Sequence, residues 1–505
     1  LACFIIQAGT GAVLAADTAK VVIITTNDIH GQLQPKTNKH MVEPPEKVGG
    51  LAYVATVIKD IERDYPGKYL LIDIGDFAQG TIESNSFIGR PVLEFMNYCG
   101  YDAMCMGNHE FDWGVEKMGE TLKDAKFPIL CANVIEEKTG KLIPYCKPYV
   151  IKNINGVKIG LIGVLTPVTK KIVKAENIKG YDIEEPADVV NRLVPILRTK
   201  GAKLIIVMSH CGLAEDREMA KKIKDVQLIA GGHSHSFIMK PEKVNDILIT
   251  QCGCKGYYVG KLLLEVDKET GKIVKYNEDY MIPVINKEIT PDPEMVEMVA
   301  KYREKVKPIM ERTIGEIDMD LDNDRAYKGL DSKIGNLITD GLRSQTESDI
   351  AFYNAGGIRS SFKKGKICFG DVFAVLPFDD AVVTMDLTGK QVKEILVHGF
   401  NKKGVVQFSG LTVTYDPAKE GEERIVKVMV GDEPLEPGKI YRVTTTAFLA
   451  TGGDGYDTFL GGKNVKYGDF ARDVFSFYLK NHSPVKKVEL GRVIKLEKEE
   501  KPESK

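Results

Sequence analysis

Residues 21–28 read VVIITTND, an apolar run that ends in the polar pair Asn27-Asp28. Four later runs have the same form, and they are YLLIDIGD (69–76), KIGLIGVLTP (158–167), KLIIVMSH (203–210) and VQLIAGG (226–232). Runs that are apolar at almost every position are typical of strands whose two faces are both covered, as in a parallel sheet flanked by helices. Helical stretches alternate with these runs along the chain. We therefore predict that residues 20–290 form an α/β domain.

A helix with clear start signals follows this region. Asp292 is a capping residue, Pro293 occupies the first helical position, and the following segment EMVEMVAKYREKVK (294–307) is apolar at helical spacing. We predict a linker helix within residues 291–313. A chain of 505 residues exceeds what one hydrophobic core usually organises. The remainder, 314–495, is predicted to be a second α/β domain with a helix at 333–344 and strands at 350–354, 381–387, 411–415 and 440–447.

The two ends of the chain differ from the rest. Residues 1–16, LACFIIQAGTGAVLAA, are mostly apolar and end in small residues, as a signal peptide does. We predict that residues 1–19 are an export signal and that the mature protein is periplasmic, secreted or at the cell surface. Residues 496–505 are charged, have no apolar anchor and are predicted to be disordered.

The charge and cysteine content limit the partners and the compartments that are compatible with the sequence. The 69 basic and 71 acidic residues give a net charge of −2, which excludes a general attraction to a nucleic-acid polymer or an anionic membrane. No apolar stretch reaches the roughly 18 residues that a membrane helix needs, so the mature chain is predicted to have no membrane span. The nine cysteines are odd in number and are predicted to be buried thiols, which argues mildly against an oxidising destination. Nothing in the sequence specifies an oligomeric state.

Polar clusters follow the strand-like runs and contain five of the eight histidines. The clusters are DIH (28–30), GD (75–76), GNHEFD (107–112), SH (209–210) and GGHSH (231–235). Because the carboxyl ends of adjacent strands in an α/β sheet meet at one crevice, clusters that are distant in sequence can meet in space. Asp, Asn and imidazole ligands suit divalent ions of borderline or hard character. The sequence therefore predicts a metal site at this edge of the sheet.

Each cluster alone has an ordinary structural explanation. Asp28 could cap a helix beside a surface His30, and Asp112 could do the same after His109. The recurrence of such clusters after several strands is what favours a metal site over these alternatives.

The order DxH, GD, GNHE, SH and GHSH resembles the calcineurin-like metallophosphoesterase superfamily, and GNHEFDWG (107–114) with the later motifs resembles the 5′-nucleotidase family within it. The resemblance implies a layered α/β metallophosphoesterase sandwich, a linker helix and a C-terminal α/β nucleotide-binding domain. It also implies two divalent metal ions, for which Zn, Mn, Co and Mg all fit. By that resemblance one ion would be held by Asp28, His30 and His235, the other by Asn108, His210 and His233, with Asp76 bridging the two.

The pair His109 and Asp112 is the predicted catalytic dyad. His109 adjoins the predicted ligand Asn108, so it would face the reacting phosphoryl group, and Asp112 could hold its imidazole charged. We assign this pair to stabilisation of the transition state.

The second half carries motifs similar to those of the 5′-nucleotidase C-terminal domain, namely NAGGIR (354–359), LPF (376–378) and AFLATGGDGY (447–456). The resemblance implies that Phe378 and Phe448 stack on the two faces of a base. Asp454 could accept hydrogen bonds from ribose hydroxyls, and Arg359 could bind phosphate oxygens with Asn354 at the same edge. Phe378 and Phe448 could instead be core residues, which is the ordinary role of a lone phenylalanine.

The predicted activity is hydrolysis of nucleoside 5′-monophosphates to nucleoside and phosphate, with other nucleotides as further substrates. Two alternatives stay open within the same scaffold, a 2′,3′-cyclic-nucleotide 2′-phosphodiesterase and a nucleotide-sugar hydrolase. A third belongs to a different class, a non-catalytic nucleotide-binding surface protein.

Overall fold

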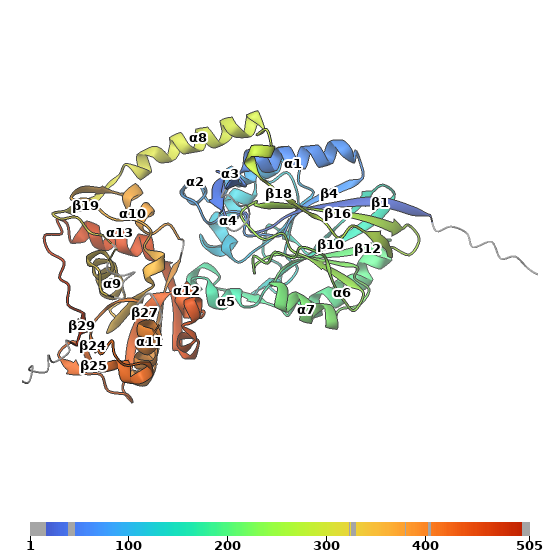
Figure 1. Ribbon diagram of the computed structural model, residues 1–505. Coiled ribbons are helices and arrows are strands. Elements are labelled where there is room, and N and C mark those ends of the chain that lie inside the picture. Colours follow the sequence, from blue (N-terminus) through green and yellow to red (C-terminus); the bar gives the residue numbers. More distant parts are fainter. Residues whose placement is uncertain are drawn as a thin grey trace, which may run out of the picture.

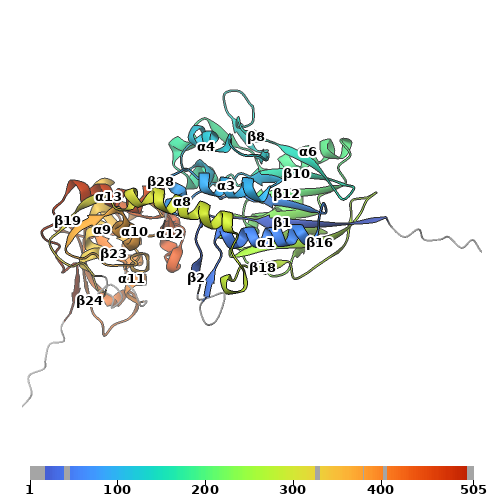
Figure 2. The ribbon, with the colours of Figure 1, turned by 90° about the horizontal axis from the view of Figure 1, so that it is seen from above.

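The structure of the protein is a computed structural model that describes residues 17–38, 46–322, 324, 330–378, 380–401 and 406–496. The described residues form an N-terminal lobe, elements β1 to β18, and a C-terminal lobe, elements β19 to β29. The helix α8 (Pro293–Met310) runs along both lobes (Figures 1 and 2). Most of the predicted export signal and of the predicted disordered tail lies outside the described residues.

Two stacked sheets form the centre of the N-terminal lobe. The first has the order β17-β16-β1-β4-β5-β6-β8, with β18 paired to β16, and the second has the order β14-β15-β13-β12-β10-β9. The first consists of β1 (Thr18–Thr26), β4 (Tyr69–Asp73), β5 (Ala103–Cys105), β6 (Ile129–Leu130), β8 (Cys146–Lys147), β16 (Tyr258–Asp267), β17 (Ile273–Tyr276) and β18 (Met281–Pro283). The second consists of β9 (Tyr149–Ile154), β10 (Val157–Leu165), β12 (Leu204–His210), β13 (Leu228–Gly231), β14 (Glu242–Val244) and β15 (Ile247–Thr250). The five predicted strand runs are thus confirmed as β1, β4, β10, β12 and β13.

The alternation of side chains along β1 explains why its run is apolar at every core position. Val21 and Ile23 point into the core between the two sheets, with Leu161 and Ile206 of the second sheet. Val22 and Ile24 point the other way, into the core beneath the helices that cover the first sheet. Those helices are α1 (Leu51–Asp64), α3 (Arg90–Cys99) and α4 (Val115–Leu122). Successive strand residues face opposite sides, so a sheet covered on both needs apolar residues throughout.

The second sheet is covered in the same way on its outer face. Its residues Ile162 and Val207 pack in a separate core with Val190 of α6 (Pro186–Thr199) and Met219 of α7 (Leu213–Lys222). The lobe therefore has four layers, helices, sheet, sheet and helices, which agrees with the predicted layered sandwich.

The predicted linker helix is α8, and its start signals act as expected. Asp292 is the N-cap, where its side chain accepts a hydrogen bond from the backbone N–H of Met295 at 3.1 Å. Met295 and Tyr302 pack into the helix-side core of the N-terminal lobe, whereas Val306 packs into a core of the C-terminal lobe. One helix thus joins two hydrophobic cores. The domain boundaries at 290/291 and 313/314 stay predictions.

The C-terminal lobe contains a five-stranded sheet, order β23-β20-β27-β22-β28, and a four-stranded sheet, order β26-β25-β24-β29. Their strands are β20 (Ile350–Tyr353), β22 (Ala381–Thr388), β23 (Gln407–Ser409), β24 (Leu411–Tyr415), β25 (Ile425–Val430), β26 (Glu433–Pro434), β27 (Ile440–Thr446), β28 (Lys463–Phe470) and β29 (Val493–Lys495). The helices α9 (Lys333–Gln345), α10 (Phe369–Val375) and α13 (Ala471–Asn481) share a core on one side of the larger sheet, and α11 (Gly389–Asn401) packs on the other. The predicted helix and four predicted strands are confirmed, although β20 and β27 each end one residue before the predicted end. β27 stops at Thr446 because the four-residue helix α12 (Ala447–Ala450) begins there.

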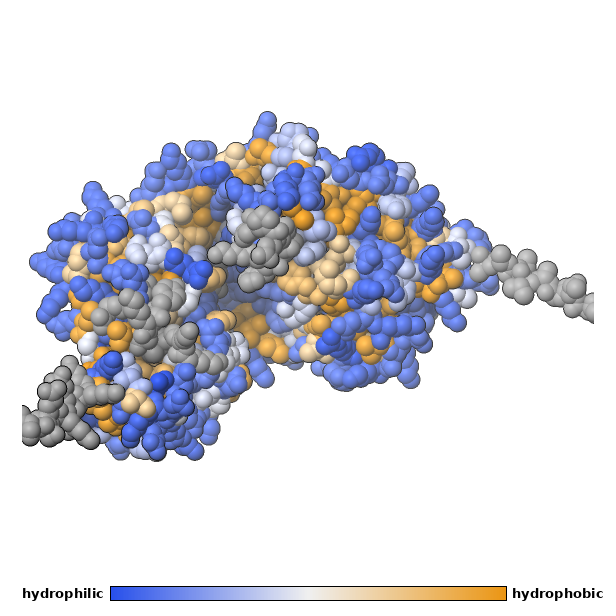
Figure 3. Space-filling model, in the orientation of Figure 1, coloured by the Kyte–Doolittle hydropathy of each residue, from blue (hydrophilic) through white to orange (hydrophobic). Residues whose placement is uncertain are grey.

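The surface mixes hydrophilic and hydrophobic residues and is recessed between the two lobes (Figure 3). Among the described residues, no helix is long and apolar enough to cross a membrane. All eight described cysteines are free thiols, and five of them are buried.

Candidate active site

The loops that leave β1, β4 and β13 carry their predicted ligands in an uncommon backbone conformation. Positive φ angles occur at Asp28 (51°), His30 (49°), Asp76 (55°), His233 (74°) and His235 (53°). For residues with a β-carbon this backbone conformation costs about 1 kcal/mol of conformational free energy, and Asp and His adopt it more readily than most residues. Such conformations cluster at functional sites, because the rest of the fold must hold them. Here they turn each loop back at the strand end, so that the polar side chains converge.

Gly107, which precedes the predicted ligand Asn108, lies against Asp76. A β-carbon at Gly107 would lie 2.2 Å from Asp76 Oδ1 and 2.5 Å from its backbone nitrogen. No other amino acid fits without moving the carboxylate. The glycine of GNHE is therefore required by the close approach of two loops.

One group of converging side chains surrounds Asp28. His235 Nε2 lies 3.4 Å and His30 Nε2 lies 4.0 Å from Asp28 Oδ1, and the two imidazole nitrogens are 2.9 Å apart. Asp28 is fully buried, and His30 is 7% exposed. Three potential ligand atoms thus point at one small volume.

A second group surrounds Asp76. His210 Nε2 lies 3.1 Å and His30 Nε2 lies 3.9 Å from Asp76 Oδ2. The ligand atoms of Asp76, His210 and His233 all lie within 4.8 Å of one another. Asp76 therefore stands between the two groups. The buried Asn108 has its Oδ1 atom without a hydrogen-bond partner among the described residues.

Backbone carbonyl groups fix two of the imidazoles. His30 Nδ1 lies 2.9 Å from the carbonyl oxygen of Gln79, and His210 Nδ1 lies 2.6 Å from that of Ile74. Since a carbonyl only accepts, each Nδ1 must carry the proton and donate it. The Nε2 atom of each ring is therefore the one that faces the carboxylates and is available to a metal ion, which is how metal-binding histidines are oriented.

The electrostatics of the cluster follow from burial and from the two carboxylates. Burial lowers the pKa of His30 to about 3 and, together with the charge of His210, that of His233 to about 4. Burial also disfavours charge on His210 and His235, yet Asp76 raises the pKa of His210 to about 9 and Asp28 raises that of His235 to about 10. The buried carboxylates thus attract positive charge to this point, and a divalent cation would supply it more completely than protons do.

The two residues of the predicted dyad are in contact. His109 Nδ1 lies 2.7 Å from Asp112 Oδ2, and the ligand atom of His109 lies within 4.8 Å of those of His30 and Asp76. Burial opposes the charged imidazolium, but Asp112 and then Asp76 raise the pKa of His109 to about 10. The helix-cap alternative for Asp112 loses its support, because its carboxylate is directed at His109.

A cleft of about 1230 Å³ connects this cluster to the C-terminal lobe. Its lining includes His30, His109, Asp112, His233 and His235 from one lobe and Asn354, Phe378, Phe448 and Asp454 from the other. Phe378 is 49% and Phe448 is 43% exposed, so neither is a core residue. Asn354 Nδ2 lies 3.5 Å from Asp454 Oδ2, which places Asn354 beside the predicted ribose-binding residue.

Arg359 is the one predicted substrate residue that does not line this cleft. Its guanidinium donates a hydrogen bond to the carbonyl oxygen of Gly356 at 3.2 Å, and the side chain is exposed to solvent. Its proposed contact with phosphate therefore has no geometric support in this arrangement of the lobes.

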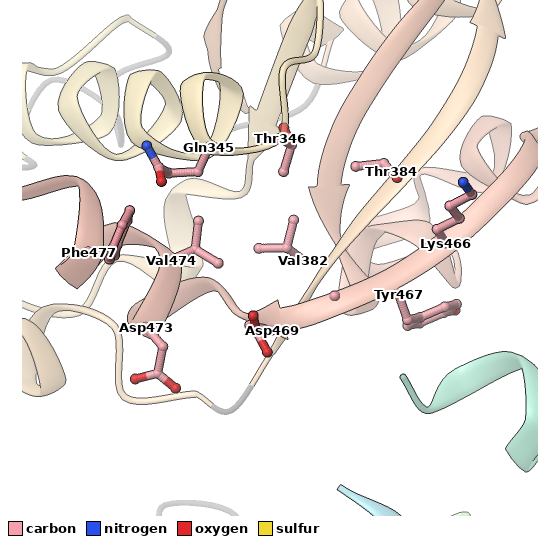
Figure 4. Close-up of a pocket in the computed structure, with 11 residues that line it drawn as sticks. Gln345, Thr346, Val382, Thr384, Lys466, Tyr467, Asp469, Asp473, Val474 and Phe477 are labelled. Atoms are coloured by element: carbon pink, nitrogen blue, oxygen red, sulfur yellow. The ribbon is translucent and has the colours of Figure 1, made fainter. Parts of the chain in front are cut away.

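A second cavity of about 490 Å³ adjoins the cleft at the end of β28 (Figure 4). Both are lined by Tyr467, Gly468, Asp469 and Asp473. At this boundary Asp469 forms an ion pair of 2.9 Å with Lys174, which follows α5 (Thr169–Ile172) in the N-terminal lobe. The two lobes are thus in direct contact beside the cleft.

Comparison with known proteins agrees with the two-lobed architecture and with a metal site in the N-terminal lobe. Residues 21–237 match the calcineurin-like phosphoesterase family, and residues 313–461 match the 5′-nucleotidase C-terminal domain. Protein UshA of Escherichia coli (strain K12) is 30% identical over 526 residues, which cover 93% of this chain and 92% of that protein. The chain belongs to the 5′-nucleotidase family. It is accordingly a phosphoric ester hydrolase with a binuclear divalent-metal centre.

Two further relatives are also similar to this 5′-nucleotidase family member over most of its length. The crystal structure of a 5′-nucleotidase precursor from Thermus thermophilus is 31% identical, with a TM-score of 0.66, over 95% of this chain and all of that chain. Endonuclease YhcR of Bacillus subtilis (strain 168) is 28% identical over 501 residues, or 93% of this chain. The chain spans only 40% of the length of that relative.

The residues of this family member fit two divalent ions. Among the described residues, Asn108 Oδ1 is a buried polar atom without a hydrogen-bond partner, as expected for an atom that binds a cation. Two carboxylates, four uncharged imidazoles and one amide would leave two divalent cations with a net positive charge, which attracts a phosphate dianion. Which of these residues bind the ions stays a prediction.

Glu110 is a residue of the site that the sequence interpretation missed. Its carboxylate is fully buried and accepts hydrogen bonds from three backbone N–H groups, those of Gly107 at 2.7 Å, Asp76 at 2.9 Å and Phe77 at 3.0 Å. It therefore fixes the loop of Asp76 against the GNHE turn. An acidic residue inside an otherwise metal-binding motif was the available signal.

Replacing Glu110 with glutamine should loosen both loops, because one amide oxygen cannot accept what two carboxylate oxygens accept. At least one buried N–H would lose its partner, at a cost of about 1–3 kcal/mol in the free energy of unfolding. Disturbing residues that orient metal ligands typically weakens metal affinity by about 10–100-fold. Metal content after dialysis and urea unfolding would measure both, with the exposed Glu116→Gln as control. Wild-type metal affinity in Glu110→Gln would contradict this role.

Proposed function

We propose that this enzyme hydrolyses nucleoside 5′-monophosphates to nucleoside and phosphate. The observation that carries the proposal is the single cleft that joins the Asp–His cluster of one lobe to two exposed phenylalanines of the other. A phosphate at the cluster and a base between the phenylalanines are the two ends of one nucleotide. A phosphate ester without a base would use only one of these ends.

At the phosphate end, Asp28, His30 and His235 would hold one ion and Asn108, His210 and His233 the other, with Asp76 between them. Two divalent ions so held would neutralise phosphoryl oxygens and lower the pKa of a water molecule enough for it to act as the nucleophile. The chain's own part is orientation. The carbonyl groups of Gln79 and Ile74 hold two imidazoles with Nε2 toward the ions.

His109 would stabilise charge that develops on the phosphoryl oxygens. Its Nδ1 proton is held by Asp112 at 2.7 Å, so the imidazolium keeps a second proton on Nε2 to donate. A charged donor inside a partly buried site contributes more to stabilisation of a transition state than it would in water.

At the base end, the rings of Phe378 and Phe448 offer flat apolar surfaces. Stacking of a base on an aromatic side chain is worth about 1–3 kcal/mol and tolerates any base. Asp454, which also has a positive φ of 54°, would accept hydrogen bonds from the ribose beside Asn354. The binding energy of this end would be used to orient the phosphate at the other.

A direct test is to strip the purified protein with a chelator and restore Mn, Co, Zn or Mg singly. Phosphate release from AMP would be measured beside 2′,3′-cyclic AMP and UDP-glucose. We expect activity on AMP to disappear on chelation and to return with at least one of the ions. A metal-loaded protein that binds AMP without releasing phosphate would support the non-catalytic alternative instead.

A second candidate is hydrolysis of phosphodiesters, and the relative named an endonuclease favours it. The same assay separates the two activities. A higher kcat/KM on 2′,3′-cyclic AMP than on AMP would make the phosphodiesterase the main activity, and a higher value on UDP-glucose would favour the nucleotide-sugar hydrolase.

We also propose that the enzyme acts outside the cytoplasm. The apolar segment 1–16 with its small terminal residues supports export. Detection of the mature protein in the extracytoplasmic fraction, cleaved near residue 19, is the expected result.

A further inference from the structure

Asp380 joins the segments that carry the two exposed phenylalanines. It follows Phe378 by two positions, and its Oδ1 atom accepts the backbone N–H of Phe448 at 2.9 Å. The register of the sheet explains this contact. Val382 of β22 pairs with Thr446 of β27 in antiparallel fashion, so Asp380 and Phe448 stand opposite each other two residues beyond that pair.

The carboxylate takes over the capping of α12. The N-cap residue of that helix, Thr446, makes no capping hydrogen bond with its own side chain. Asp380 instead receives hydrogen bonds from the backbone N–H groups of Ala447 and Phe448. Its own carbonyl oxygen accepts the N–H of Ala471, the first residue of α13, at 2.9 Å. Asp380 thereby ties the start of β22 to two helices.

Phe448 needs such a restraint, because little else holds it. Its ring is 43% exposed, and it has no ring contact with another aromatic side chain among the described residues. On one side it lies against Gly453, where a β-carbon would be 2.7 Å from the ring and 2.4 Å from the carbonyl oxygen of Phe448. The position of the ring is therefore set by the backbone at Phe448. Asp380 accepts the N–H of that residue, and the Thr451 hydroxyl donates to its carbonyl oxygen at 3.2 Å.

We infer that Asp380 is a positioning residue for the base: by binding the N–H of Phe448 it holds that ring at a fixed separation from Phe378. The inference rests on the proposed function, in which the two rings enclose the base. It assigns to Asp380 no contact with the reacting phosphate. A loosened Phe448 would weaken binding of the base and leave the metal cluster as it is.

The charge of Asp380 agrees with this assignment. Burial raises the pKa of Asp380 to about 6, while the polar groups of Thr446, Phe448 and Ala447 beside it oppose that rise. Its carboxylate thus interacts with backbone N–H groups of its own lobe. These groups lie at the start of a helix, where a negative charge is stabilising. A phosphate-binding residue would carry the opposite charge.

The test compares Asp380→Ala with Asp380→Asn, which retains an oxygen for the Phe448 N–H. KM and kcat would be measured for AMP and for 4-nitrophenyl phosphate, which has no base, and the Kd of adenosine by calorimetry. Loss of a cap typically changes an equilibrium by about tenfold. We expect Asp380→Ala to raise the KM for AMP and the Kd of adenosine by about tenfold, with a much smaller change for 4-nitrophenyl phosphate. Asp380→Asn should fall between this variant and the wild type.

The control is Asp416→Ala, which removes a carboxylate that accepts a backbone N–H at 2.9 Å on an exposed loop of the same lobe. An unchanged Kd for adenosine in Asp380→Ala, or equal effects on both substrates, would overturn the inference while the proposed function stands. A wild-type enzyme that neither binds adenosine nor releases phosphate from AMP would overturn both.

Discussion

Replacement of Asp76 with asparagine is expected to lower kcat/KM for AMP by at least about a thousandfold. Asp76 Oδ2 lies 3.1 Å from His210 Nε2 and 3.9 Å from His30 Nε2, and these two imidazoles belong to different groups of predicted ligands. An amide at this position has the size of the carboxylate and lacks its charge. The charge is what two cations held close together need most, because it screens their mutual repulsion.

Measuring the bound metal tests whether the loss of activity in Asp76→Asn comes from loss of an ion. The wild type should retain two equivalents of metal per chain after dialysis against dilute metal, and Asp76→Asn should retain one or none. Asp188→Asn, at an exposed position in the first turn of α6, is the matched control and should behave as the wild type. Two tightly held equivalents and normal turnover in Asp76→Asn would exclude a bridging role for this residue.

The strands of the N-terminal lobe could be predicted from the sequence because their environment is uniform. Val21 to Ile24 are buried on both faces, and burial on both faces leaves a run of apolar residues that needs no periodicity to be recognised. The linker helix could be predicted because its signals are local, a capping Asp292 followed by Pro293. The end of β27 could not, because the helix that replaces it is capped by Asp380, which precedes Phe448 by 68 residues in the chain.

The same distinction applies to the site. Asp28 and Asp76 follow a strand and His210 ends one, so topology alone brings them to one edge, and their side-chain chemistry indicates a metal site. Glu110 and Asp380 act through backbone N–H groups, which every segment has, so nothing in the sequence indicates their partners. Arg359 was predicted from its motif, yet its side chain donates to Gly356 and does not line the cleft. A motif predicts which residue type occupies a position. The direction of its side chain depends on the neighbouring residues in the folded structure.

Replacement of His109 with glutamine is expected to lower kcat for AMP by about a thousandfold with little change in KM. A charged donor that acts on the transition state contributes about 10²–10⁴-fold when it is well positioned. His109 is not among the residues predicted to bind metal, so His109→Gln should leave the metal content at the wild-type value. Steady-state kinetics and metal analysis of the same preparation test both statements.

Asp112→Asn separates orientation from charge in the same pair. In the wild type, His109 Nδ1 lies 2.7 Å from Asp112 Oδ2. Asparagine could still accept a hydrogen bond from Nδ1, but without a negative charge it would not stabilise the imidazolium. A smaller loss, about 10–100-fold, is expected, and the double variant should be no slower than His109→Gln, because Asp112 acts only through the ring that has been removed. The leaving group decides between two roles for the proton. If His109 stabilises the phosphoryl oxygens, His109→Gln should lose as much activity on 4-nitrophenyl phosphate as on AMP. If it protonated the leaving group, the nitrophenolate, which needs no proton, would be released at nearly the wild-type rate.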